Sequence, residues 1–435
     1  MSIPLNRFYP HIESILKQIS NNIIIYRFYP HGSKKLEDLT TLNNSGVGTT
    51  WVERQKTGVI ICHDQEPLHY DLYTDDMVLD FVKHDQKYIL NRHPYILNKI
   101  AKLHLRAAII SPLNCYENTL LLHSEKNSSE LKKYNNNNFI GVYWWSHAII
   151  ARDWFRYAEH VQQHKQIQKT FLIYNRAWAG TREYRLKFLD FLLRIGLEDH
   201  CQTSVNPIEP ELGIHYDTHQ FTKANWQPTN VLENFFTINT AQSYDSADFN
   251  IKDYESTDIE VVLETLFDDA RLHLTEKSLR PIACGQPFIL ASTAGSLEYL
   301  QSYGFKTFMN IWDEHYDLIE DPEERLMCIA DLMKQIANWA PWVREEKMVE
   351  AQAIAEYNKN LFFSAEFHNK IFDELKTNLI TGVTELNQGI TDKHYRELRE
   401  AAKYDPELEK IVNRDSPWRT QEDVNTVLAW IKNPT

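Results

Sequence analysis

The chain has 435 residues, 43% of them hydrophobic, which is enough for two or three domains with buried cores. Its formal net charge of −14 is opposite to the basic footprint of most nucleic-acid-binding proteins, although it leaves room for a local basic groove. The five cysteines form no CxxC motif, and the sequence has neither a signal-peptide core nor an apolar run of about 18 residues. We therefore expect a soluble, cytoplasmic protein without a disulfide framework or a membrane span.

In the first half of the chain, short apolar runs predict β-strands. The two clearest are residues 23–28 and 58–62, and weaker ones lie at 88–90, 107–110 and 139–145. A polar tract with four consecutive asparagines precedes the last of these strands and predicts a surface loop.

A new unit begins near residue 170. There the sequence predicts a strand at 170–174, a loop at 175–180 and a helix at 182–195, in which leucines recur on one face. Further along, residues 258–262 predict a strand, and 275–300 predict a helix, a strand at 287–291 and a second helix.

Strands that alternate with amphipathic helices are typical of the α/β class. We expect two Rossmann-like domains facing a cleft, the first at residues 1–165 and the second at 166–345. Residues 346–435 are predicted to form a helical C-terminal segment, whose tail from about 380 to 435 is polar. Helices are predicted at 323–340 and 347–376. We expect this C-terminal segment to pack partly on the first domain.

Ligands of such sheets bind beyond the carboxyl ends of the strands, so polar motifs that directly follow strands are the candidate sites. Arg176 and Arg182 flank the glycine-containing loop after the 170–174 strand, and Thr181 is a reasonable N-cap for the following helix. A helix start with arginines beside it favours phosphate binding. The alternative is a solvated loop with surface arginines.

The triplet Thr275-Glu276-Lys277 opens the helix of the 275–300 unit. Lys277 is suited to neutralise a pyrophosphate, and Glu276 can accept hydrogen bonds from ribose or sugar hydroxyls. An exposed charge pair without a function is the alternative interpretation.

Residues 260–300 resemble the donor-binding core of α1,3-fucosyltransferase-type glycosyltransferases (family 10), including divergent viral or bacterial members, and GFKTFMNIWDEHYD at 304–317 resembles the segment that follows. The resemblance implies a GT-B fold, a nucleoside-diphosphate-sugar donor and inversion at the anomeric carbon. Thr265 follows Glu264 where the family usually has Asn, so the resemblance does not predict the sugar. The implied donor-binding residues are Arg176, Arg182, Glu264, Thr275, Glu276 and Lys277.

An inverting transferase needs a carboxylate that takes the proton from the acceptor hydroxyl, and the resembled family supplies it from the N-terminal domain. His63, Asp64 and Glu66 directly follow the predicted 58–62 strand. We expect Glu66 to be the catalytic base, with Asp64 as the second choice. The residues expected to bind the acceptor are His63, Trp144, Trp145 and His147, although interdomain packing is the alternative for the last three.

The expected activity is therefore a metal-independent glycosyltransferase that needs no cofactor besides its nucleotide-sugar donor, with a glycan as the acceptor. No DxD, HExxH or Cys/His grouping that would bind a metal occurs in the sequence, and no dinucleotide or P-loop motif. Two alternatives remain. One is a viral-type transferase acting on a hydroxymethylated DNA base, and the other is a non-catalytic protein that binds a nucleotide-sugar or a glycan.

Overall fold

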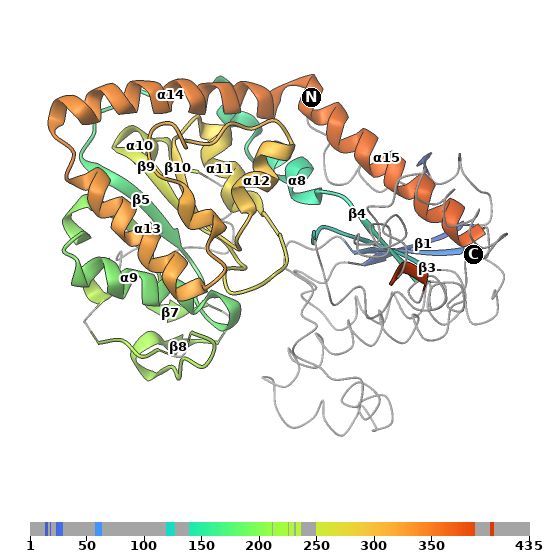
Figure 1. Ribbon diagram of the computed structural model, residues 1–435, viewed down its shortest axis with the longest axis horizontal. Coiled ribbons are helices and arrows are strands. Elements are labelled where there is room, and N and C mark those ends of the chain that lie inside the picture. Colours follow the sequence, from blue (N-terminus) through green and yellow to red (C-terminus); the bar gives the residue numbers. More distant parts are fainter. Residues whose placement is uncertain are drawn as a thin grey trace. The chain divides into compact units, whose positions relative to one another are not determined.

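The computed structural model describes residues 14–15, 18, 23–28, 57–62, 119–126, 139–210, 212–224, 226–229, 232–235, 249–387 and 401–403 (Figure 1). The chain divides into two compact units. The central unit contains His147–Ile371, and the flanking unit contains Leu5–Ser146 together with Phe372–Thr435. Among the described residues, no helix is long and apolar enough to cross a membrane. The assignment of separate donor and acceptor domains stays a prediction.

The flanking unit contains a parallel four-stranded sheet. Its strands follow the chain order β1-β2-β3-β4. Their bounds are Ile23–Phe28 for β1, Thr57–Cys62 for β2, Thr119–His123 for β3 and Phe139–Tyr143 for β4. The predicted strands at 23–28, 58–62 and 139–145 are thereby confirmed, whereas β3 was not predicted. The predicted strands at 88–90 and 107–110 lie outside the described residues.

The central unit contains a second parallel sheet, with the order β10-β9-β5-β6. Its strands are β5 (Lys169–Asn175), β6 (Cys201–Val205), β9 (Thr257–Leu263) and β10 (Phe288–Ala291). All four residues of β10 are buried, as are most of β5 and β9. This explains why they read as apolar runs, because parallel strands are covered on both faces. The fold is thus α/β and compatible with a Rossmann-like arrangement.

Helices lie before, between and after the strands of this sheet in the chain (Figure 1). Helix α9 packs against α13, and α11 packs between β9 and α14. The helices are α8 (Ser146–Trp154), α9 (Tyr184–Arg194), α10 (Ile251–Glu255), α11 (Glu276–Cys284), α12 (Ser296–Ser302), α13 (Pro322–Ala337), α14 (Pro341–Phe363) and α15 (Ala365–Asn387). A short antiparallel pair, β7 (Ile208–Glu209) with β8 (Ile214–His215), follows β6.

Two details of the predicted helices are wrong. Thr181 is not the N-cap of α9, because a 3-10 turn at Gly180–Arg182 comes first and the N-cap is Glu183, without a side-chain cap hydrogen bond. The single helix predicted at 347–376 is two helices, α14 and α15, separated at Ser364.

Arg152, on α8, forms hydrogen bonds with the C-terminal end of α14. Its guanidinium donates to the carbonyl oxygens of Phe362, Phe363 and Ser364, the last two at 3.0 Å. The carbonyls of Phe362 and Phe363 lie in the last turn of α14, where carbonyls have no intrahelical partner, so a buried cation satisfies them and complements the negative end of the helix dipole.

In the flanking unit, α15 is hydrogen-bonded to the last strand of the sheet. The side-chain amide of Asn378 donates to the carbonyl oxygen of Tyr143, at the end of β4, over 2.8 Å. A segment from beyond residue 371 therefore completes a unit whose strands all precede residue 147.

Candidate functional site

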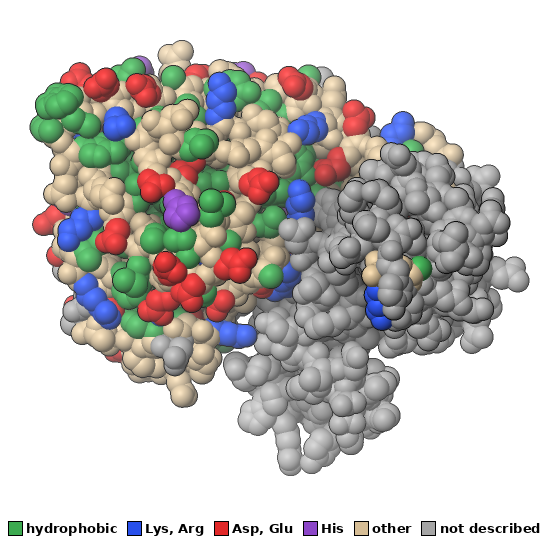
Figure 2. Space-filling view, viewed as in Figure 1, with side chains coloured by type: hydrophobic (Ala, Val, Ile, Leu, Met, Phe, Trp, Pro, Cys, Tyr) green, Lys and Arg blue, Asp and Glu red, His purple; other side chains and the backbone are tan. Residues whose placement is uncertain are grey.

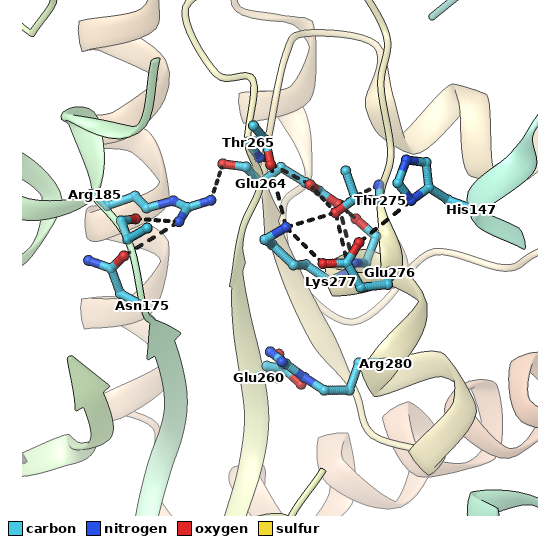
Figure 3. A network of polar contacts seen from close by, with 12 residues as sticks. His147, Asn175, Arg185, Glu260, Glu264, Thr265, Thr275, Glu276, Lys277 and Arg280 are labelled. Carbon is cyan, nitrogen blue, oxygen red and sulfur yellow. Dashed lines mark hydrogen bonds and ion pairs between the residues drawn. The ribbon is translucent and has the colours of Figure 1, made fainter. Parts of the chain in front are cut away.

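The carboxyl ends of β5 and β9 form a topological switch point. From β5 the chain crosses to β6 on one side, and later returns to β9 on the other side of β5. Because these two connections diverge, the carboxyl ends of the two strands are the place where open α/β sheets usually bind ligands. The residues that follow β5 and β9 and those at the start of α11 surround this point (Figure 3).

The carboxylate of Glu264, the first residue after β9, is fully buried. Its Oε1 accepts from Thr275 N (2.9 Å), Ser278 N (3.2 Å) and Ser278 Oγ (2.6 Å), and its Oε2 accepts from Thr265 N (3.1 Å) and Thr275 Oγ1 (2.8 Å). Both oxygens are therefore engaged inside the protein. Glu264 thus attaches the end of β9 to the start of α11, and its predicted contact with the donor stays a prediction.

Helix α11 begins and ends at residues suited to those positions. Thr275 is the N-cap, and its Oγ1 accepts from Lys277 N at 3.3 Å. Gly285 ends the helix with a φ of 68°, a conformation that costs L-residues energy but not glycine. Since Glu264 occupies backbone donors of the first turn, that turn is not an open anion site of the usual kind.

The ammonium of Lys277 lies above the end of β9. It donates to Glu276 Oε1 at 2.9 Å, Thr275 Oγ1 at 3.2 Å and Thr265 Oγ1 at 3.4 Å (Figure 3). The Lys277 side chain keeps 19% of its surface exposed, while the Glu276 side chain keeps only 4%. Lys277 is therefore the member of the predicted Glu-Lys pair that a ligand can reach.

Glu276 lies between two basic side chains. Its Oε2 is 3.5 Å from Nδ1 of His147, whose ring is completely buried and packs edge-on against the His273 ring with centroids 5.0 Å apart. Burial acts to raise the pKa of Glu276, but the positive charge of Lys277 and the His147 ring outweigh burial and hold this pKa well below its usual value. Glu276 is therefore an anion at neutral pH.

Arg185, in the first turn of α9, was missed by the sequence analysis. Its guanidinium donates to Ala177 O (2.6 Å), Glu264 O (3.0 Å) and Asn175 Oδ1 (3.5 Å), and thus bridges the residues after β5 and β9. The side chain is 2% exposed, and no carboxylate of the described residues lies within ion-pair distance of it. Burial lowers the pKa of Arg185, as does the charge of Arg182, whereas Tyr184 and the more distant carboxylate of Glu264 act to raise this pKa without outweighing burial.

The two predicted arginines lie close by in the sequence. Arg176 directly follows β5, is half-buried, and makes no hydrogen bond or ion pair with the part of the chain that the structure describes. Arg182 is also half-buried, and its charge acts on Arg185. The loop after β5 therefore concentrates positive charge at the switch point. One feature of the sequence could have identified Arg185 as a candidate. It lies three residues after Arg182, on the first turn of the following helix.

The other predicted residues lie elsewhere. Glu66, Asp64 and His63 are outside the described residues. The indoles of Trp144 and Trp145 are buried in the flanking unit, with 1% and 0% of their surface exposed. His147, expected to bind the acceptor, lies beside Glu276, which was expected to bind the donor.

Within the described residues, no cluster of three or more His, Cys, Asp or Glu side chains has the arrangement of a metal site. No protein-family model, no curated protein and no solved structure matches the chain. The function must therefore be argued from the chemistry of the switch point itself.

Proposed function

We propose that this protein is an inverting glycosyltransferase of the GT-B type, which binds the diphosphate of a nucleoside-diphosphate sugar beyond the carboxyl ends of β5 and β9. The observation that carries the proposal is Arg185, a buried guanidinium at the switch point, which has carbonyl and amide oxygens as partners but no carboxylate in the described residues. A buried cation without a counter-ion is unfavourable, and an anionic ligand would supply one.

Lys277 supports the same interpretation from the other side of β9. Its ammonium is partly exposed and is held by the hydroxyls of Thr265 and Thr275 as well as by Glu276. Together with Arg176 and Arg182, it provides positive charge where a departing diphosphate would need it. In this proposal, basic side chains stabilise the leaving group.

The chemistry of the proposed sugar transfer is set by the nucleoside-diphosphate-sugar donor. The acceptor hydroxyl oxygen attacks the anomeric carbon, the bond from that carbon to the diphosphate oxygen breaks, and the hydroxyl proton passes to a carboxylate. Glu66 is the proposed base, with Asp64 as the second choice. The positive charge of Lys277 and the arginines balances the negative charge that develops on the leaving diphosphate.

A glycan is the proposed acceptor. Acidic and basic side chains are interspersed on the face shown in Figure 2, and the lysines and arginines of the described residues form no continuous patch there. Nucleic-acid binding draws its affinity from such patches. The charge distribution on this face therefore gives no specific support for a DNA acceptor.

A thermal-shift panel of nucleoside diphosphates and nucleoside-diphosphate sugars tests the proposal, because a ligand that binds only the folded state raises the melting temperature. We expect at least one compound to stabilise the protein. Lys277→Ala and Arg185→Lys should reduce that stabilisation, whereas the exposed Lys252→Ala should leave it unchanged. If no compound in the panel shifts the melting temperature of the wild-type protein, the proposal is wrong.

A turnover assay distinguishes a glycosyltransferase from a non-catalytic protein that only binds the donor. With a compound identified by the panel, release of the nucleoside diphosphate is measured with and without candidate glycans. Donor binding without release under any condition would favour the non-catalytic alternative. Glu66→Gln is expected to keep donor binding and to lower turnover by about 10²–10⁴-fold, the usual contribution of a positioned base.

A further inference from the structure

Glu276 has a basic side chain on either side of its carboxylate, and the two contacts differ. Its Oε1 accepts a hydrogen bond from Lys277 at 2.9 Å, while its buried Oε2 accepts none from the described residues. Nδ1 of His147 is 3.5 Å from this oxygen, an ion-pair distance, and neither nitrogen of the completely buried ring makes a hydrogen bond to the part of the chain that the structure describes. Leaving buried polar atoms unpaired costs about 1–3 kcal/mol, so this arrangement calls for an explanation.

The ring of His147 contacts one carboxylate and one other histidine in the described residues. In the described residues, the titratable groups that face the ring are Glu276, on α11, and His273, on the segment before that helix. Lys277 lies on the far side of the Glu276 carboxylate. One carboxylate is therefore placed between two basic side chains that compete for it (Figure 3).

We propose that His147 is a positioning residue that takes the Glu276 carboxylate from Lys277 when an anion binds, and that it takes up one proton in doing so. The anion meant here is the diphosphate of the donor, so this inference rests on the proposed function. It adds a regulated step to that site: without an anion, Lys277 is neutralised by Glu276, and with an anion, Glu276 turns to protonated His147.

Charge balance gives the reason. If His147 stayed neutral, the entering anion and Glu276 would have to share the Lys277 ammonium, and like charges in contact repel each other. A proton taken from solvent onto the imidazole provides a second cation for the second anion. Among the side chains, imidazole is the one that commonly exchanges a proton in response to a nearby change of charge.

Titration calorimetry with inorganic pyrophosphate, at pH 6 to 8 and in two buffers of different ionisation enthalpy, counts the protons taken up on binding. We expect the wild-type protein to take up close to one proton more than His147→Asn, in which an amide replaces the ring near Nδ1. The ionisation of pyrophosphate is the same for both proteins and cancels. Between pH 8 and pH 6 the affinity of the wild type should gain up to about tenfold per pH unit relative to the variant, the linkage expected for one proton.

Two further variants make the result specific. Glu276→Gln removes the carboxylate for which His147 competes, so it should lose the extra proton uptake even if His147→Asn fails to fold. His164→Asn, which changes an exposed histidine of the same unit, should behave as the wild type. Equal proton uptake in wild type, His147→Asn and Glu276→Gln would overturn the inference while leaving the proposed function intact. A wild-type protein that binds no pyrophosphate would overturn both.

Discussion

Ser278 donates two hydrogen bonds to the carboxylate of Glu264, from its backbone N at 3.2 Å and from its Oγ at 2.6 Å. Glu264 directly follows β9, and Ser278 belongs to the first turn of α11. The start of the helix that carries Glu276 and Lys277 is thus fixed to the sheet by a carboxylate of the protein itself. The geometry around Lys277 consequently depends on a residue that needs no contact with a ligand.

We expect Glu264→Gln to lower the free energy of unfolding by about 3 kcal/mol, because buried hydrogen bonds to a charged acceptor are lost and an amide NH2 is placed among donors. Urea denaturation measures this change. The exposed Glu298→Gln on α12 is the control and should change stability by less than about 0.5 kcal/mol. Equal stabilities of the two variants would contradict the role given to Glu264.

The ion pair between Arg280 and Glu260 offers a second test. Arg280 Nη2 is 2.6 Å from Glu260 Oε1, both side chains are almost fully buried, and Tyr254 Oη donates to the other carboxylate oxygen at 2.8 Å. Arg280→Met leaves this carboxylate without its buried counter-charge, so we expect a loss of about 3–5 kcal/mol in unfolding free energy.

The matched control is Arg156→Met, which removes an exposed partner from Asp153 over a 3.7 Å contact. It should cost less than about 1 kcal/mol. Combining Arg280→Met with Glu260→Leu should recover much of the loss, since no charge is then left unpaired. A double variant that is less stable than Arg280→Met would contradict this account.

A pH-dependent contribution to stability is expected from Asp317. Burial raises the pKa of this carboxyl to about 7, outweighing the hydrogen bond that it accepts from Leu297 N at 3.0 Å. The unfolded chain ionises near the ordinary value of about 4, so the folded state holds the proton more tightly. The resulting stabilisation is complete below about pH 4 and is lost as the pH rises through about 7.

Asp317→Asn keeps an acceptor for Leu297 N but has no proton to lose, so its unfolding free energy should fall less between pH 4.5 and 7.5 than that of the wild type. Part of the slope should persist, because burial also raises the pKa of Glu314 to about 7. Urea denaturation across this pH range measures both slopes. Glu320→Gln, an exposed change on the same segment, controls for the removal of a carboxylate. Identical slopes for Asp317→Asn and the wild type would show that burial does not raise this pKa.

The end of α11 gives a purely steric prediction. Gly285 has a φ of 68°, and a Cβ there would lie 3.2 Å from Cδ of Lys359. Gly196, after α9, has a φ of 73° with no atom within 4 Å of the corresponding Cβ. Both alanine variants should lose about 1–2 kcal/mol through the left-handed backbone, and Gly285→Ala should lose more because of Lys359. Thermal unfolding compares them, and an equal loss would mean that the lysine moves aside at no cost.

The parallel strands were predictable because their residues are buried on both faces. The runs at 258–262 and 287–291 are apolar for that reason, and they became β9 and β10. The sequence CQTSV of β6 carries no such signal, since its three central residues are half-buried. Its pairing with β5 is a tertiary effect. The break between α14 and α15 is marked in the sequence by Ser364 alone, whose Oγ accepts from Phe367 N at 3.1 Å in the manner of an N-cap, and a lone serine is too common to predict a break.

For the site, the sequence singled out Glu264, Thr275, Glu276 and Lys277, and the structure brings these four together. It did not separate the residues that a ligand can contact from those that hold them in place. That distinction depends on which oxygens of Glu264 are already bonded, and sequence spacing does not contain it. Arg185 was missed for a similar reason, because its burial between the ends of β5 and β9 arises from the order of the strands.

The interruption of the flanking unit by the central unit has a consequence for biosynthesis. The ribosome releases the N-terminal end of a chain first, and domains generally fold as units. All of His147–Ile371 has been synthesised before Phe372–Thr435, which the flanking unit includes and from which Asn378 bonds to Tyr143. The residues His147–Ile371 are therefore all made before the part of α15 that bonds to β4. Strands β1 to β4, although made earlier, lack this contact until Asn378 has been synthesised, so the flanking unit cannot be completed before the central unit has been made.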